Sequence, residues 1–168
     1  TRRGAFYSVS CASPGNCTAV GEFKNSAGRT EAFTMTSRDG QWEQARPAEF
    51  AAGIQSDQSN YSWFSSVSCA TPGNCTAVGS FMNSYGHDEA FTMTSRDGEW
   101  EQAQPAEFAE GVQFDAAGFY SVSCASPGNC TAVGRFEYPI DSQEYPASEA
   151  FTMTSSDGEW EQARPAEF

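Results

Sequence analysis

Two short segments near the start of the chain show an alternating pattern of side chains. In residues 7–11, Tyr7, Val9 and Cys11 alternate with serines, and in residues 17–21, Cys17, Ala19 and Gly21 alternate with Thr18 and Val20. This period of two is typical of β-strands. The segment Ser13-Pro14-Gly15 between them supplies a fixed φ at proline and a permitted positive φ at glycine, as turns require. The pattern therefore predicts a β-hairpin with both of its cysteines on one face.

The spacing of the two cysteines predicts a disulfide across this hairpin. A three-residue loop would place Ala12 opposite Asn16 and Cys11 opposite Cys17, close enough for a bond with modest adjustment. A zinc site would need four converging ligands, whereas the chain has one histidine and separate cysteine pairs. So short a ring contributes roughly 2 kcal/mol to stability. The predicted pairs are Cys11–Cys17, Cys69–Cys75 and Cys124–Cys130.

Two more strands are predicted after the hairpin. Residues 31–36 are rich in β-forming side chains, and Asp39-Gly40 is a strong hairpin signal. Residues 42–45 would then form the fourth strand, which Pro47 would end because it lacks an amide hydrogen. Four antiparallel strands in sequence make a β-meander.

This meander occurs three times. Residues 8–21 return almost unchanged at 66–79 and 121–134, so we expect one domain of three repeats, at about 1–57, 58–115 and 116–168. The connecting segments 47–57 and 105–115 share one pattern, and the third copy stops at Phe168. We expect the chain to be trimmed, partly disordered at its end, or one part of a larger ring.

The third repeat breaks the symmetry. It carries five additional residues within 135–149, between its second and third strands. We expect a longer surface loop there. Such a loop is a common carrier of function, although neutral drift in a tolerant connection would also produce it.

Composition and charge narrow the class of protein. With 39% hydrophobic and 14% aromatic residues, the 168-residue chain is globular in composition. Its net charge of −13 suits solubility and opposes binding to nucleic acid or to anionic membranes. Three disulfides imply an oxidising compartment, and the chain begins at Thr1 rather than methionine, so we expect a mature, secreted, extracellular product.

The repeated motifs resemble a known family. Residues 8–21 followed by 32–42 look like the cysteine-containing β-propeller repeats of secreted actinobacterial proteins, and the likeness covers essentially the whole chain. The S-x-D-G-x-W turn also resembles the Asp-box of sialidase-like propellers, shortened by one residue. There the Asp-box is a structural turn between the third and fourth strands of a blade and identifies no activity. The matching residues are Ser37, Asp39, Gly40 and Trp42; Ser95, Asp97, Gly98 and Trp100; and Ser155, Asp157, Gly158 and Trp160.

The resemblance implies an all-β propeller with three four-stranded blades. Since four to eight blades usually close a ring, we expect a homodimer to complete a six-bladed ring. The alternative fold is a β-trefoil, which also has three four-stranded repeats and closes its core within one chain.

No catalytic constellation is evident. A Ser-His-Asp triad requires an imidazole, and His87 is the only histidine, in a polar connection. The carboxylates that could serve a glycosidase recur in every repeat, whereas a single active site would break the symmetry. They are Glu31, Glu89 and Glu149, and Glu43, Glu101 and Glu161. With no D-x-D-x-D-G loop for calcium, we expect no metal, no cofactor and no enzymatic activity.

The binding candidates are the aromatic residues that depart from the repeat pattern. We expect a non-enzymatic binding or assembly module that engages itself and an extracellular protein, with neither nucleic acid nor membrane as a partner. A glycan-binding, lectin-like module is the alternative, and a sialidase-like glycoside hydrolase comes third. The candidate residues are Tyr61, Trp63, Tyr85, Tyr138 and Tyr145.

Overall fold

The fold is all-β. The computed structural model of the 168-residue chain describes residues 3–55, 61–139 and 147–167, and every regular element in these ranges is a strand. Within the same ranges, no helix is long and apolar enough to cross a membrane.

Each repeat is an antiparallel meander of three long strands followed by two strands of two residues. The first repeat comprises β1 Gly4–Ser13, β2 Asn16–Lys24, β3 Thr30–Arg38, β4 Gln41–Trp42 and β5 Arg46–Pro47. The second comprises β6 Ser62–Thr71, β7 Asn74–Met82, β8 Asp88–Arg96, β9 Glu99–Trp100 and β10 Gln104–Pro105. The third comprises β11 Ala116–Ser126, β12 Asn129–Glu137, β13 Ser148–Ser156, β14 Glu159–Trp160 and β15 Arg164–Pro165.

The fourth strand differs from the prediction. It is split into two short pieces that both pair with β3, and Pro47 lies within the second piece, opposite Phe33. Pro47 is the last residue of β5, so the strand does end at this proline, although residues 43–45 were wrongly expected to belong to it. The missing amide hydrogen of Pro47 is tolerated because β5 lies at the edge of the sheet, where no further strand needs that donor.

The disulfide hairpin has the expected cysteine pairing and a different turn. Cys11 lies opposite Cys17, but Ser13 rather than Ala12 is the partner of Asn16, so the turn contains only Pro14 and Gly15. The register shifts between Cys11 and Ser13, which is a β-bulge. The prediction of a three-residue loop was wrong, because Ser13 belongs to the strand and Ala12 is the extra residue of the bulge.

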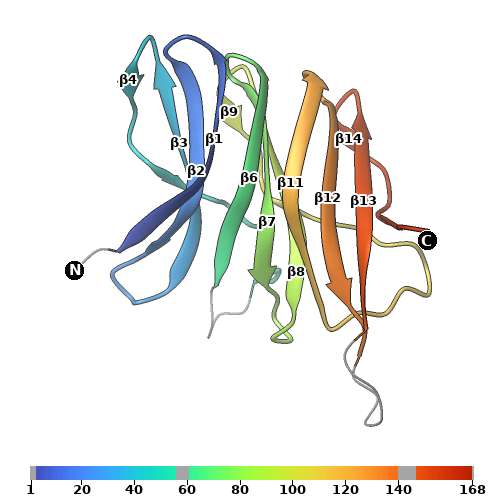
Figure 1. The fold of residues 1–168 in the computed structure, drawn as a ribbon. Coiled ribbons are helices and arrows are strands. Elements are labelled where there is room, and N and C mark those ends of the chain that lie inside the picture. Colours follow the sequence, from blue (N-terminus) through green and yellow to red (C-terminus); the bar gives the residue numbers. More distant parts are fainter. Residues whose placement is uncertain (1–2, 56–60, 140–146, 168) are drawn as a thin grey trace.

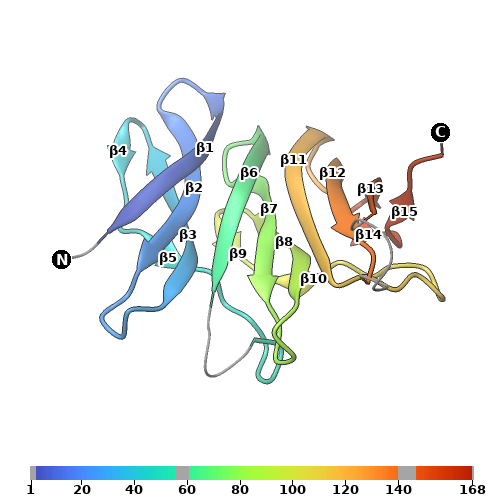
Figure 2. The same cartoon turned by 60° about the horizontal axis from the view of Figure 1, so that its bottom comes forward.

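The three repeats lie side by side, with the two ends of the chain at opposite ends of the array (Figure 1). The first repeat is a separate five-stranded sheet, while the second and third form one ten-stranded sheet through a single parallel pair, Asp88 with Ala116. The strands β1, β6 and β11 are neighbours along the array (Figure 2). The all-β class is confirmed, because every regular element described is a strand. The sheets do not close into a barrel, so the β-trefoil alternative does not fit.

The hydrophobic core lies between the repeats rather than within them. Each repeat has two unlike faces, and two separate clusters form where the faces of neighbouring repeats meet. We call the side with large residues the Phe face; in the second repeat it contains Phe64, Val67, Phe91 and Met93. We call the opposite side the Val face; in the first repeat it contributes Val20 and Ala32 to the same cluster.

Candidate functional site

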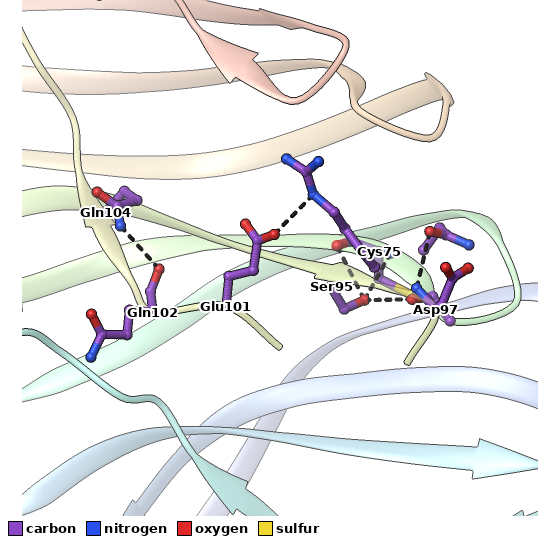
Figure 3. Close-up of polar contacts among 9 residues, drawn as sticks. Cys75, Ser95, Asp97, Glu101, Gln102 and Gln104 are labelled. Carbon is purple, nitrogen blue, oxygen red and sulfur yellow. Dashed lines mark hydrogen bonds and ion pairs between the residues drawn. The ribbon is translucent and has the colours of Figure 1, made fainter. Parts of the chain in front are cut away.

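The Asp-box-like turn and the cysteine turn form one hydrogen-bonded unit in each repeat. In the second repeat, the hydroxyl of Ser95 accepts a hydrogen bond from the Cys75 amide at 3.0 Å and donates one to the Gly73 carbonyl at 2.9 Å (Figure 3). The Asp97 amide donates to the side chain of Asn74 at 3.3 Å. Asp97 itself has a positive φ of 51°, which aspartate tolerates better than most residues. These residues thus hold the two turns together through hydrogen bonds.

All three predicted disulfides are present. The structure pairs Cys11 with Cys17, Cys69 with Cys75 and Cys124 with Cys130, and leaves no free cysteine. Three disulfides in a chain of this size are typical of extracellular proteins.

The first set of recurring carboxylates organises the turns between the second and third strands. Glu31 accepts a hydrogen bond from the Asn25 amide group at 2.5 Å, and Glu89 accepts one from Asn83 at 2.6 Å. In the third repeat, Tyr138 occupies the position of these asparagines and hydrogen-bonds to Glu149.

The second set of recurring carboxylates forms exposed ion pairs. Glu43 lies 2.8 Å from Arg38, and Glu101 lies 2.9 Å from Arg96, the pair drawn in Figure 3. In the third repeat, Ser156 replaces this arginine, and Glu161 instead lies 3.5 Å from Arg164. Exposed ion pairs of this kind add little to the stability of the fold.

The remaining polar candidates do not gather. His87 is exposed, and its Nδ1 lies 3.0 Å from the carbonyl oxygen of Asp115. Among the residues in the described ranges, no three His, Cys, Asp or Glu side chains converge as metal ligands would.

Two of the five aromatic binding candidates come together. The rings of Tyr61 and Trp63 lie 4.9 Å apart at the start of β6. By contrast, Tyr85 is 86% exposed at a turn, and Tyr138 packs its ring against Phe136. Tyr145 lies outside the described residues.

The groove beside Tyr61 and Trp63 also contains residues that sequence reasoning missed. Tyr7 and Glu22 of the first repeat and Ser65 of the second line it, and it has a volume of about 310 Å³. We call it the aromatic groove. Tyr7 follows the repeat pattern, because Tyr120 occupies the same position of the third repeat, so no signal in the sequence marked it as a binding residue.

Burial and nearby carboxylates both act on the two tyrosines of the aromatic groove. Burial, a hydrogen bond to Glu22 and the charge of Glu22 together raise the pKa of Tyr7. Burial and the charges of Glu22 and Asp88 raise the pKa of Tyr61. Burial is the largest cause for both phenols, and the neighbouring carboxylates add to it.

The Phe face of the first repeat is uncovered. Phe6 is 55% exposed and Val9 is 60% exposed, whereas their counterparts in the second repeat, Phe64 and Val67, are 0% and 6% exposed. The counterparts in the third repeat are equally buried. The difference arises because the second and third repeats each have a preceding repeat to cover this face.

The Val face of the third repeat is uncovered as well. Val133 is 42% exposed, whereas Val20 and Val78 at the same position are both 0% exposed. Thr131 and Thr152 beside it are also exposed, although their counterparts in the first two repeats are buried. The array thus ends in two unlike faces, each of which is buried wherever another repeat lies against it.

Comparison with protein-family models and with curated proteins finds no match for this chain.

Proposed function

We propose that the chain is a secreted, non-enzymatic binding and assembly module of the β-propeller type, and that its protein partner is a second copy of itself. The observation that carries this proposal is the exposure of two end faces that every internal junction buries. Exposed apolar faces of this kind are uncommon on soluble monomers. The three disulfides support secretion, and the structural partners of the recurring carboxylates support the absence of catalysis.

The two junctions inside the chain supply the template for this assembly. In the first, the amide of Val67 donates to the Ser8 hydroxyl at 3.2 Å, and the amide of Cys69 donates to Ser10 at 3.0 Å. In the second junction, Ser66 and Ser68 accept the same two bonds from Val122 and Cys124, at 3.3 and 3.0 Å. One geometry therefore serves both junctions.

The same geometry defines the contacts between copies. Ser121 and Ser123 of the third repeat stand at the acceptor positions, and the amides of Val9 and Cys11 of the first repeat stand at the donor positions. Within the chain, Thr18 Oγ1 and Thr76 Oγ1 lie 3.5 and 3.4 Å from the sulfurs of Cys75 and Cys130. Thr131 of one copy is accordingly expected to meet Cys17 of the other.

Two copies would satisfy both end faces at once. The third repeat of each copy would cover the first repeat of the other, so that two equivalent junctions arise around a two-fold axis. With three blades from each chain, the product is a six-bladed ring, within the usual range for propellers. A head-to-tail contact that failed to close would instead grow into filaments.

Sedimentation equilibrium under non-reducing conditions tests the proposal. We expect a single species of about twice the chain mass of 18.1 kDa at micromolar concentration. Val9→Glu and Val133→Glu each place a charge in the proposed junction and should give monomers. Tyr85→Glu, at an exposed turn away from both end faces, is the matched control and should leave the dimer intact.

Mixing the two junction variants tests whether the faces pair with each other. A mixed dimer of Val9→Glu and Val133→Glu contains one doubly altered junction and one unaltered junction. The mixture should therefore associate, although each variant alone does not. A well-folded wild-type monomer, or a mixture as monomeric as its components, would reject the ring.

A further inference from the structure

The three repeats differ in sequence at the edge of the aromatic groove. The cross-strand pair at its edge is Ala5 with Glu22 in the first repeat, and Trp63 with Ser80 in the second. In the third repeat the pair is Gly118 with Arg135. The cysteine turns and the Asp-Gly pairs keep their residues across the repeats, whereas this edge does not, and a binding site that occurs once in the array needs such a difference.

The groove presents aromatic faces from two repeats to solvent. Tyr7 comes from β1, while Tyr61 and Trp63 lie at the start of β6. Tyr7 is 51% exposed and Tyr61 is 40% exposed, so both rings are open to solvent. The planes of the Tyr61 and Trp63 rings meet at 51°, so the pair forms a bent surface rather than a flat one.

The charge in the groove is unbalanced. Glu22 lines it, and no Lys or Arg occurs among the described residues of its lining. Asp88 lines the next groove along the array, yet its charge also influences Tyr61, and one of its carboxylate oxygens is buried without a hydrogen-bond partner in the described part of the chain. The next groove along the array differs, because there Arg135 is paired with Glu137.

We propose that the aromatic groove binds a small molecule carrying a trimethylammonium group, with the faces of Tyr61, Trp63 and Tyr7 around the cation and Glu22 as its counter-charge. The negative face of an aromatic ring attracts a cation, and rings arranged as a cage favour quaternary ammonium ions in particular. A neutral sugar could also lie against these rings, but it would leave the carboxylate charge without compensation. The volume of about 310 Å³ is more than enough to admit choline.

Titration calorimetry of the intact wild-type chain with choline chloride, at constant ionic strength, tests this proposal. Choline is compared with 3,3-dimethylbutan-1-ol, its neutral isostere, and with glycine betaine, in which a carboxylate accompanies the same cation. We expect choline to bind at least about fivefold more tightly than the neutral isostere, because the ring faces and Glu22 attract the charge. Betaine should bind more weakly than choline, since Glu22 and Asp88 repel its carboxylate.

Variants locate the binding in the groove. Trp63→Ala should weaken choline binding by about tenfold. Glu22→Gln keeps the size of the side chain and should weaken binding by about threefold, while binding of the neutral isostere stays unchanged. Tyr85→Ala is the control for an exposed tyrosine outside the groove and should bind choline as the wild type does.

Several results would overturn the proposal. Equal affinity for choline and its neutral isostere would show that charge plays no role. Unchanged choline binding in the folded Glu22→Gln and Trp63→Ala variants would place the cation elsewhere. Binding of methyl glucoside without any binding of choline would make the groove a glycan site instead. Because the groove lies within one chain, the monomeric Val133→Glu variant should retain choline binding, which separates this test from that of the ring.

Discussion

The amide of Cys75 donates a hydrogen bond to the hydroxyl of Ser95 at 3.0 Å, across 20 positions of the sequence. This bond ties the disulfide hairpin to the Asp-box-like turn. The same hydroxyl donates to Gly73 on the other side of the cysteine turn, so one side chain satisfies two backbone groups. Ser37 and Ser155 do the same in the other repeats, which explains why this serine recurs beside each Asp-Gly.

Ser95→Ala should lower the free energy of unfolding by about 1–3 kcal/mol, because it leaves the Cys75 amide and the Gly73 carbonyl without their partner. Chemical denaturation followed by fluorescence measures the loss. Ser84→Ala, at an exposed position of a turn, is the control and should stay within about 0.5 kcal/mol of the wild type. An unchanged denaturation midpoint for Ser95→Ala would show that the bond is dispensable.

Removing different disulfides should lower the free energy of unfolding by different amounts. The three rings have the same sequence separation of 6 residues, so the chain-entropy contribution of each is similar, at roughly 2 kcal/mol. Cys75 is also buried in the core between the repeats, whereas Cys17 is only half-buried. Replacing Cys69 and Cys75 by alanine should therefore destabilise the protein more than replacing Cys11 and Cys17.

Denaturation of both double variants in the Val133→Glu background removes any contribution from self-association. Equal losses would indicate that the buried sulfur adds nothing beyond the entropy of the ring.

Gly79 should tolerate no side chain. A Cβ atom at this position would lie 1.9 Å from the carbonyl oxygen of Trp63, on the neighbouring strand. Since backbone cannot move away as a flexible side chain can, Gly79→Ala should cost more than about 3 kcal/mol or abolish folding. Circular dichroism and denaturation provide the measurement.

Gly86 offers the matched comparison, because its φ is +87° and nothing lies within 4 Å of the Cβ position. Gly86→Ala should cost only about 1 kcal/mol, from backbone strain alone. Similar losses for the two variants would contradict the close approach at Gly79.

Asp88 should make stability depend on pH. Burial, and then the charge of Glu137, raises the pKa of Asp88 above its ordinary value of 3.8. The folded protein therefore retains this proton to a higher pH than the unfolded chain. The stabilisation is complete below about pH 3.8 and is lost as the pH rises through the raised pKa of the folded state.

Asp88→Asn remains uncharged throughout, so its stability relative to the wild type should increase from acid to neutral pH. Thermal unfolding between pH 3 and pH 8 compares the two proteins. Parallel curves across this range would contradict the raised pKa.

Local pattern predicted much of the fold. The period of two, the Pro-Gly and Asp-Gly turns and the cysteine spacing were sufficient for the meander and for all three disulfides. The bulge at Ala12 and the split fourth strand were missed, because both depend on which neighbouring strand accepts a backbone group. The local residue pattern does not indicate which strand a backbone group pairs with.

The aromatic groove was only half predictable. Tyr61 and Trp63 departed from the repeat pattern and could be singled out, whereas Tyr7 and Glu22 joined them only through the packing of one repeat against the next. Glu22 was overlooked for a physical reason: a carboxylate in a strand of an acidic protein is ordinarily a solvated surface group.

The two junctions inside the chain also imply a gradient in local stability. Since each core cluster lies between neighbouring repeats, the second repeat is held on both sides, while the first and third are each held on one. In such a one-dimensional array, opening begins at the ends and moves inward. Amide hydrogens of β7 should therefore exchange with solvent most slowly in the monomer, and those of β2 and β12 faster, although the three strands have nearly the same sequence. Ring formation would level this gradient, because it would give every repeat two neighbours.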